Sequence, residues 1–212
     1  MPKVRTRLVN IALHSTFLGS HGTFFQNTNS MSDGPIIDLQ SDHYFMGEAL
    51  RQAAQAYKAE EVPVGAVVVR TGRIIARAYN QVELLKDATA HAEMLALTQA
   101  EEVAGDWRLN ECTLYVTKEP CPMCAGAIVH VRLARVVFGA PDLKAGAAGT
   151  VLNLLQFPAF NHQAEITRGV REAECRDLLR TFFAEQRAKQ KADSGRPKPQ
   201  FGREDGMSPD NI

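Results

Sequence analysis

Two short motifs limit how this chain can fold. One is P-C-P-M-C at residues 120–124, and the other is a histidine and a glutamate two positions apart, His91 and Glu93. Residues two apart on a helix point about 200° away from each other, so His91 and Glu93 can share one site only at the start of a helix. Prolines are tolerated in a first helical turn, so residues 120–124 also begin a helix. A joint site therefore requires two helix N-termini to meet.

Together the motifs supply three ligands for a metal ion, the imidazole of His91 and the thiolates of Cys121 and Cys124. A structural zinc takes four protein ligands, whereas a catalytic zinc keeps one position for water. We therefore expect one Zn²⁺ per subunit, bound by these three side chains. The dipoles of the two helices would favour the thiolate forms of both cysteines.

Glu93 is expected to be the catalytic residue beside the metal and not a ligand. Zinc lowers the pKa of a bound water to about 7. A carboxylate next to that water can take its proton and deliver it to a substrate ring and then to a leaving amine. Taken alone, C-x-x-C is often a redox pair or half of a structural zinc site, and Glu93 would be a solvated first-turn carboxylate. Only the combination indicates catalysis.

H-x-E followed by P-C-x-x-C is the signature of zinc-dependent nucleobase deaminases. From residue 48 to 187 the chain resembles the bacterial-type tRNA-specific adenosine deaminases of the cytidine/deoxycytidylate deaminase superfamily. The signature identifies only the superfamily, whereas G-A-A-G at residues 146–149 and N-H at 161–162 identify the tRNA branch. The other matching segments are E-V-P-V-G-A-V at 61–67, A-T-A-H-A-E at 88–93, L-Y-V-T at 114–117, E-P-C-P-M-C-A-G at 119–126 and V-V-F-G-A at 136–140.

This resemblance implies hydrolytic deamination of adenosine to inosine at the wobble position of a tRNA anticodon. The partner would be the tRNA anticodon arm, and the enzyme would be a homodimer in which each active site borrows surface from the other subunit. A deaminase of free guanine or cytosine bases or nucleosides would use the same zinc and glutamate. An RNA-binding scaffold subunit would lack the glutamate, so Glu93 disfavours that alternative.

The resemblance also implies which residues contact the substrate. The flipped nucleotide would be contacted by Asn80, Val62 and the backbone of Ala92. Flanking nucleotides would lie near Asp142 and Lys144. The last helix would offer Phe182, Phe183 and Arg187 for stacking and phosphate contact. Pro141 stands where the family often has arginine, so one phosphate or base contact is missing from the pattern. Without the resemblance, Asn80 would fit a turn that ends a strand, and a phenylalanine pair on an amphipathic helix is usually part of a core.

Hydrophobic periodicity predicts an α/β domain, and the resemblance implies a three-layer, cytidine-deaminase-like fold with a mixed five-stranded sheet flanked by helices. Strands are predicted at residues 64–70, 73–80, 112–117, 136–139 and 164–167, and helices at 46–57, 91–104, 121–131 and 171–189. The first two strands form a hairpin. Residues 140–162 are long enough for a crossover, so the last strand can run parallel to its neighbour. The last helix should bury Leu178, Leu179, Phe182 and Phe183.

The overall charge gives no sign of a nucleic-acid partner, because 24 basic and 24 acidic residues cancel. Any tRNA affinity must come from a local patch, for which the basic residues between 186 and 198 are candidates. Four cysteines, two of them assigned to zinc, are typical of a reducing compartment. The chain has no apolar run of about 18 residues, so no membrane partner is expected.

The two ends differ from the middle of the chain. We expect an N-terminal extension at residues 1–40, a zinc-dependent deaminase domain at 41–190 and a disordered tail at 191–212. The first 30 residues contain no Asp or Glu and carry Lys3, Arg5 and Arg7, which is similar to an organelle transit peptide. Met31 followed by S-D is typical of a natural start, and we favour an overextended beginning. The protein is therefore expected in the cytoplasm, with organelle targeting as the alternative.

Overall fold

The structure is a computed structural model that describes residues 38–194. Most of the predicted N-terminal extension lies outside the described residues. The same is true of the possible transit peptide and of the possible start at Met31. The predicted tail lies outside them too, except for its first four positions, which continue the last helix. Within the described part, no helix is long and apolar enough to cross a membrane.

A mixed five-stranded sheet forms the centre of the fold, as predicted. The strands are β1 (Gly65–Arg70), β2 (Arg73–Tyr79), β3 (Cys112–Lys118), β4 (Arg135–Ala140) and β5 (Glu165–Arg168). Their order across the sheet is β2-β1-β3-β4-β5. β1 runs antiparallel to β2 and β3, whereas β3, β4 and β5 are parallel to one another. The parallel pairs confirm the crossover expected before β5.

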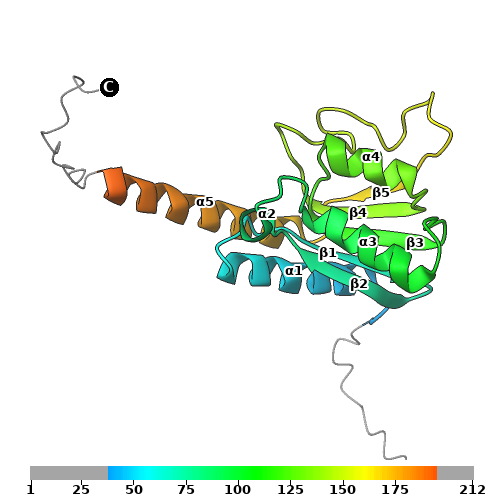
Figure 1. The fold of residues 1–212 in the computed structure, drawn as a ribbon, viewed down its shortest axis with the longest axis horizontal. Helices are drawn as coiled ribbons and strands as arrows, with labels where there is room; N and C mark the ends of the chain where they lie inside the picture. Colours follow the sequence, from blue (N-terminus) through cyan, green and yellow to red (C-terminus); the bar gives the residue numbers. More distant parts are fainter. Residues whose placement is uncertain (1–37, 195–212) are drawn as a thin grey trace, which may run out of the picture. The chain divides into compact units, whose positions relative to one another are not determined.

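Helices cover both faces of the sheet (Figure 1). α1 (Asp42–Lys58) and α5 (Glu172–Ser194) pack on one face, and α3 (Ala92–Ala104) and α4 (Pro122–His130) lie on the other. Alternation along β1 explains this arrangement, because Val68 joins the core beneath α3 and α4 while Val67 joins the core beneath α1 and α5. The result is the predicted three-layer fold.

Tight turns end the elements where the sequence predicts them. Thr71 and Gly72 join β1 to β2 with φ values of 47° and 74°, which is the backbone of a type I′ hairpin turn. Gly105 ends α3 with a φ of 68° and donates its N–H to the carbonyls of Glu101 and Glu102. These turns fix the register of the hairpin and the length of α3.

The helices differ from the prediction at two points. The four-residue helix α2 (Val82–Leu85), which follows β2, was not predicted. The last helix was expected to bury both phenylalanines, but Phe182 is 6% exposed and Phe183 is 43% exposed. Adjacent residues on a helix point about 100° apart, so one of them faces the core while the other faces outward. Phe182 packs edge-on against Tyr57 of α1, with 5.8 Å between ring centroids.

Candidate active site

The two motifs begin two helices, as their spacing requires. His91 is the N-cap of α3, and Cys121 is the N-cap of α4. Pro122 occupies the first turn of α4, where its missing N–H costs no hydrogen bond. Cys124 lies in the same turn and therefore returns to the side of Cys121. Both helix starts thus place short polar side chains at their positive ends.

Three ligand atoms converge between these helix starts. The Nδ1 atom of His91 lies 3.7 Å from Sγ of Cys121 and 3.4 Å from Sγ of Cys124, and the two sulfurs are 3.7 Å apart. Among the described residues, these three form the group of His, Cys, Asp and Glu side chains that could hold a metal ion. Cys124 is buried, whereas His91 and Cys121 are partly exposed toward the cavity above them.

Electrostatics at the cluster favour a cation. The hydrogen bond from the Cys124 thiol lowers the pKa of Cys121 to about 3, and the same contact raises the pKa of Cys124. The hydrogen bond to Cys121 also raises the pKa of His91. Cys121 is therefore the stronger acid of the two, and a metal ion bound here would take both cysteines as thiolates.

Glu93 lies in the first turn of α3 and lines the same cavity as His91 and Cys121. Its side chain is nearly inaccessible, because the residue is 4% exposed. Burial raises the pKa of the Glu93 carboxyl above its ordinary value. A carboxyl in this setting holds a proton more readily than an exposed one, which suits a group that accepts and releases protons.

The cavity above these residues has a volume of about 380 Å³. Its walls come from the residues before β1 and after β2, the end of β3, the starts of α3 and α4, α2 and α5. The lining residues are Glu61, Val62, Val64, Asn80, Val82, Glu83, His91, Glu93, Lys118, Glu119, Cys121 and Phe183. The predicted contacts Val62, Asn80 and Phe183 therefore all line this cavity, while Ala92 is fully buried and is not among the lining residues.

Comparisons with known proteins identify the family of this chain. The MafB19-like deaminase family matches residues 40–187. The tRNA-specific adenosine deaminase of Bacillus subtilis is 53% identical over 154 residues, which cover 73% of this chain and 96% of that protein. The chain belongs to the tRNA-specific adenosine deaminase family.

Solved structures share the fold of this deaminase. One comes from a study of A-to-I editing by tRNA:A34 deaminases; it is 42% identical with a TM-score of 0.62, covering 64% of this chain and 99% of that chain. A second is the guanine deaminase from Nitrosomonas europaea, 26% identical with a TM-score of 0.59. That match covers 68% of this chain and 85% of the other.

A second, wider depression of about 960 Å³ adjoins the deaminase cavity, and Phe183 lines both. The loop after β4 and the outer surface of α5 form its walls. Lys144 and Arg187, which were predicted to contact flanking nucleotides and phosphates, both line it. Arg176 and Arg180 add two further cations, which form ion pairs with two anions of the same lining, Glu172 and Asp177.

Asp142 has a different setting from the one expected. It lines neither depression and forms an ion pair with Lys118, whose side chain reaches the wall of the deaminase cavity. Burial opposes ionisation of Asp142, but the hydrogen bond and charge of Lys118 and the backbone N–H groups of Lys144 and Ala145 together outweigh it, and the pKa of Asp142 is lowered. Its carboxylate also accepts the N–H groups of Lys144 and Ala145. Asp142 therefore shapes the loop that carries Lys144.

Glu119 was not among the predicted site residues, although it lies between Lys118 and the P-C-x-x-C motif. It is 1% exposed, and its carboxylate accepts the backbone N–H groups of Asp142, Ala148 and Thr150, each at 3.0 Å. Gly146 passes so close to this carboxylate that a Cβ atom there would collide with it. Glu119 thus fixes the loop that separates the two depressions.

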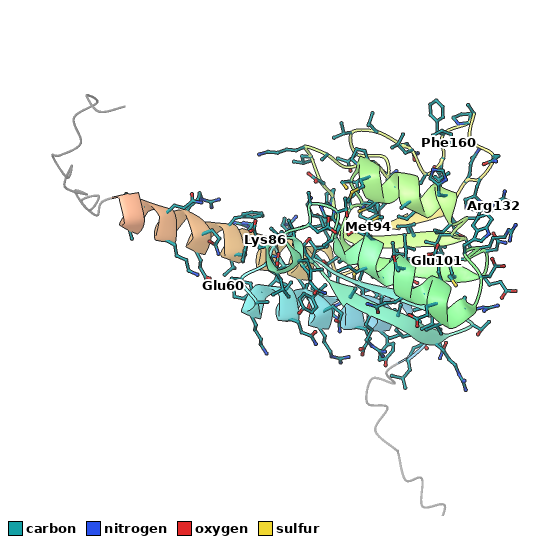
Figure 2. The ribbon with its side chains drawn as sticks, viewed as in Figure 1. Glu60, Lys86, Met94, Glu101, Arg132 and Phe160 are labelled. Atoms are coloured by element: carbon teal, nitrogen blue, oxygen red, sulfur yellow. The ribbon has the colours of Figure 1, made fainter. Side chains whose placement is uncertain are left out.

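The basic residues near the end of α5 are not equivalent. Lys189 donates to Glu60 at 2.6 Å and thereby ties α5 to the residues that follow α1. Figure 2 labels Glu60 at this end of the molecule, where α5 passes the end of α1. Arg187 is exposed and lines the wider depression. Of these two residues, Arg187 lines the candidate substrate surface and Lys189 does not.

Proposed function

We propose that this protein hydrolyses adenosine to inosine at the wobble position of a tRNA anticodon. One observation carries the proposal: the ligand atoms of His91, Cys121 and Cys124 meet at the base of a cavity that Glu93 also lines. Membership of the tRNA-specific adenosine deaminase family supports the choice of adenosine in tRNA.

We propose that the metal is zinc, with one ion per subunit. Tetrahedral zinc with Zn–S near 2.3 Å and Zn–N near 2.0–2.1 Å separates two sulfurs by about 3.8 Å and a sulfur from a nitrogen by about 3.6 Å. The observed separations are 3.7 Å between the sulfurs and 3.4 and 3.7 Å between nitrogen and sulfur. With three protein ligands, one position faces the cavity. When bound there, zinc supplies a water of lowered pKa as the nucleophile.

Glu93 would move the protons of the reaction. The carboxylate takes a proton from the attacking water and delivers it to N1 of adenine as the new C6–O bond forms. It then passes the second proton of that water to the amine, so the C6–N bond breaks, ammonia leaves and inosine remains. The raised pKa of Glu93 suits this exchange, because its buried carboxyl retains a proton more readily than an exposed one.

The substrate side would divide between the two depressions. Asn80 and Val62, with the backbone of Ala92, would surround the flipped base in the smaller cavity. Lys144 and Arg187 would meet flanking nucleotides and phosphates in the wider one, with Asp142 holding the loop in place. Phe183 joins both and is exposed enough to stack on a base. Phe182 packs edge-on against Phe183 from the core, and its own ring is buried.

The alternative is a deaminase of free guanine or cytosine bases or nucleosides. The structural similarity to a guanine deaminase shows that one fold can accommodate such chemistry, but at 26% identity. The wider depression next to the cavity, where Lys144 and Arg187 remain beside two arginine–carboxylate pairs, favours a polynucleotide, because a free base needs no surface beyond its own pocket. A scaffold without catalysis is disfavoured by Glu93 in the cavity wall.

The decisive experiment measures inosine formation on an anticodon stem-loop with adenosine at the wobble position. A stem-loop with that adenosine moved one position along serves as the matched control. We expect kcat/KM on the first to exceed that on free adenosine, guanine and cytidine by orders of magnitude, and to fall as salt rises. Comparable turnover of free guanine or cytidine, independent of salt, would make this a small-molecule deaminase.

We further propose a homodimer, a deaminase domain spanning residues 41–190 and a cytoplasmic location. The family match over residues 40–187 supports the domain limits. Four free cysteines support a reducing compartment. Exposed apolar side chains on the loop before β5, namely Val151, Leu152, Phe157 and Phe160, support burial against a second subunit. Light scattering of the purified protein tests the dimer, and a monomer at micromolar concentration would contradict it.

A further inference from the structure

Glu61 is a buried carboxylate that the proposed reaction does not use. It follows α1 and is 1% exposed, yet it lines the cavity that holds Glu93 and His91. Its backbone N–H donates to the carbonyl of Ala56 at 2.9 Å, which anchors it to the end of α1. A buried charge is costly unless hydrogen bonds satisfy it, so the partners of this carboxylate indicate its role.

The two oxygens of Glu61 bind two different walls of the cavity. Oε2 accepts a hydrogen bond from Nδ2 of Asn80 at 3.0 Å, and Oε1 accepts one from the backbone N–H of Leu84 at 2.6 Å. Asn80 follows β2, and Leu84 belongs to α2. One carboxylate therefore joins the end of the hairpin to the short helix α2, whose residues Val82 and Glu83 also line the cavity.

We propose that Glu61 is a positioning residue that fixes the orientation of the Asn80 amide in the substrate cavity. An ionised carboxylate only accepts hydrogen bonds, so the NH₂ end of the amide must face Glu61, and Oδ1 is turned away from it. Asn80 is 6% exposed and lines the cavity, and its backbone N–H is held by the carbonyl of Val64 at 3.0 Å. This role of Glu61 rests on the proposed function at one point, which is that the cavity receives the nucleobase of the substrate.

A substitution of one atom tests this orientation. In Glu61→Gln the side chain keeps its shape, but the Leu84 N–H is a fixed donor and holds the glutamine oxygen on its side. The new NH₂ group then faces Asn80, whose amide must rotate to offer its oxygen. The cavity consequently loses the carbonyl that Asn80 presents in the wild type.

Exchanging the two functional groups should restore the arrangement. In the double variant Glu61→Gln/Asn80→Asp, the glutamine oxygen still accepts from Leu84, and its NH₂ group donates to the new carboxylate. The second carboxylate oxygen then occupies the place of Asn80 Oδ1. Asn80→Asp alone places two carboxylates next to each other, and we expect this variant to have a low kcat/KM.

The experiment compares the wild type, both single variants and the double variant for kcat/KM on the wobble-adenosine stem-loop. Zinc content and melting temperature are measured in parallel, and Glu60→Gln at the exposed neighbouring position is the matched control. We expect each single variant to lose roughly 10- to 100-fold in kcat/KM and the double variant to recover to within a few-fold of the wild type. Glu60→Gln should match the wild type.

Two results would overturn the role of Glu61. Full activity in Glu61→Gln would show that the Asn80 amide does not need Glu61 to orient it. A double variant whose kcat/KM is no higher than that of the less active single variant would show that the two residues do not act as a pair. If the wild type fails on the stem-loop but deaminates a free base, the proposed function fails, and the same four proteins assayed on that base still test the pair.

Discussion

The base of the cavity and its rim are assembled in different ways. At the base, His91, Cys121 and Cys124 come from two helix starts, and their short side chains leave little freedom. The rim draws on residues after α1, on α2, on the loop after β4 and on α5. Its groups are held by hydrogen bonds between segments that are distant in the sequence, such as Glu61 to Asn80.

This difference determines how each side should respond to substitution. A metal site with three ligands has no redundancy, so one lost ligand removes the function of the whole base. The rim distributes contact over many groups, and each contributes a fraction of the binding free energy. Substitutions at the base should therefore abolish activity, and substitutions at the rim should reduce it only in part.

The largest effect is expected from a ligand. Cys121→Ser or His91→Ala should lose metal and activity together, because two remaining ligands do not hold zinc in a catalytic site. Metal analysis and the inosine assay measure both properties. Cys175→Ala is the control, since Cys175 is a buried cysteine that packs against Gly139 and is not part of the cluster. Full zinc in Cys121→Ser would contradict the ligand assignment.

A smaller loss, with metal retained, is expected at Glu93. Glu93→Gln should keep zinc and RNA binding while activity falls by about 10²–10⁴-fold, the contribution of one acid/base group. The exposed Glu102, on the same helix, provides Glu102→Gln as the control. Loss of zinc in Glu93→Gln would make this residue a ligand and would refute the proton-transfer role.

The base of the site could be predicted because its geometry is local. The spacing in P-C-x-x-C, the two-residue step from His91 to Glu93 and the prolines define two helix starts without any knowledge of distant contacts. The strands and the three layers follow from alternation within single segments, as Val67 and Val68 illustrate. Periodicity is sufficient wherever an element is long enough to display it.

The rim could not be predicted because its contacts are not local. α2 has four residues, too few for a helical period. Glu119 is important for the loop after β4 through three backbone N–H groups, which no residue pattern reveals. Phe182 and Phe183 look alike in the sequence, and only the direction of α5 decides which ring is buried.

Glu119 tests whether the rim yields partial effects. In Glu119→Gln one oxygen becomes an NH₂ group that faces a backbone N–H, so a buried donor loses its partner. We expect a cost of about 1–3 kcal/mol, a melting temperature lower by roughly 3–10 °C and a KM raised several-fold, with zinc retained. Glu111→Gln, at an exposed position paired with Arg70, is the control. Complete loss of activity at full zinc content would place Glu119 in the chemistry itself.

The smallest effect, and the one that separates rim residues from each other, is expected at the end of α5. Arg187 is exposed on the wider depression, whereas Lys189 is engaged with Glu60. If Arg187 neutralises a phosphate, Arg187→Ala should weaken binding of the stem-loop and lower the slope of log K against log salt by about 1. Lys189→Ala should leave that slope nearly unchanged, because its charge is already paired. Binding titrations at several salt concentrations measure both slopes. Equal slopes in the two variants would mean that the positive charges at the end of α5 attract RNA without a specific phosphate contact. The rim would then extend beyond the depression that Phe183 and Arg187 line.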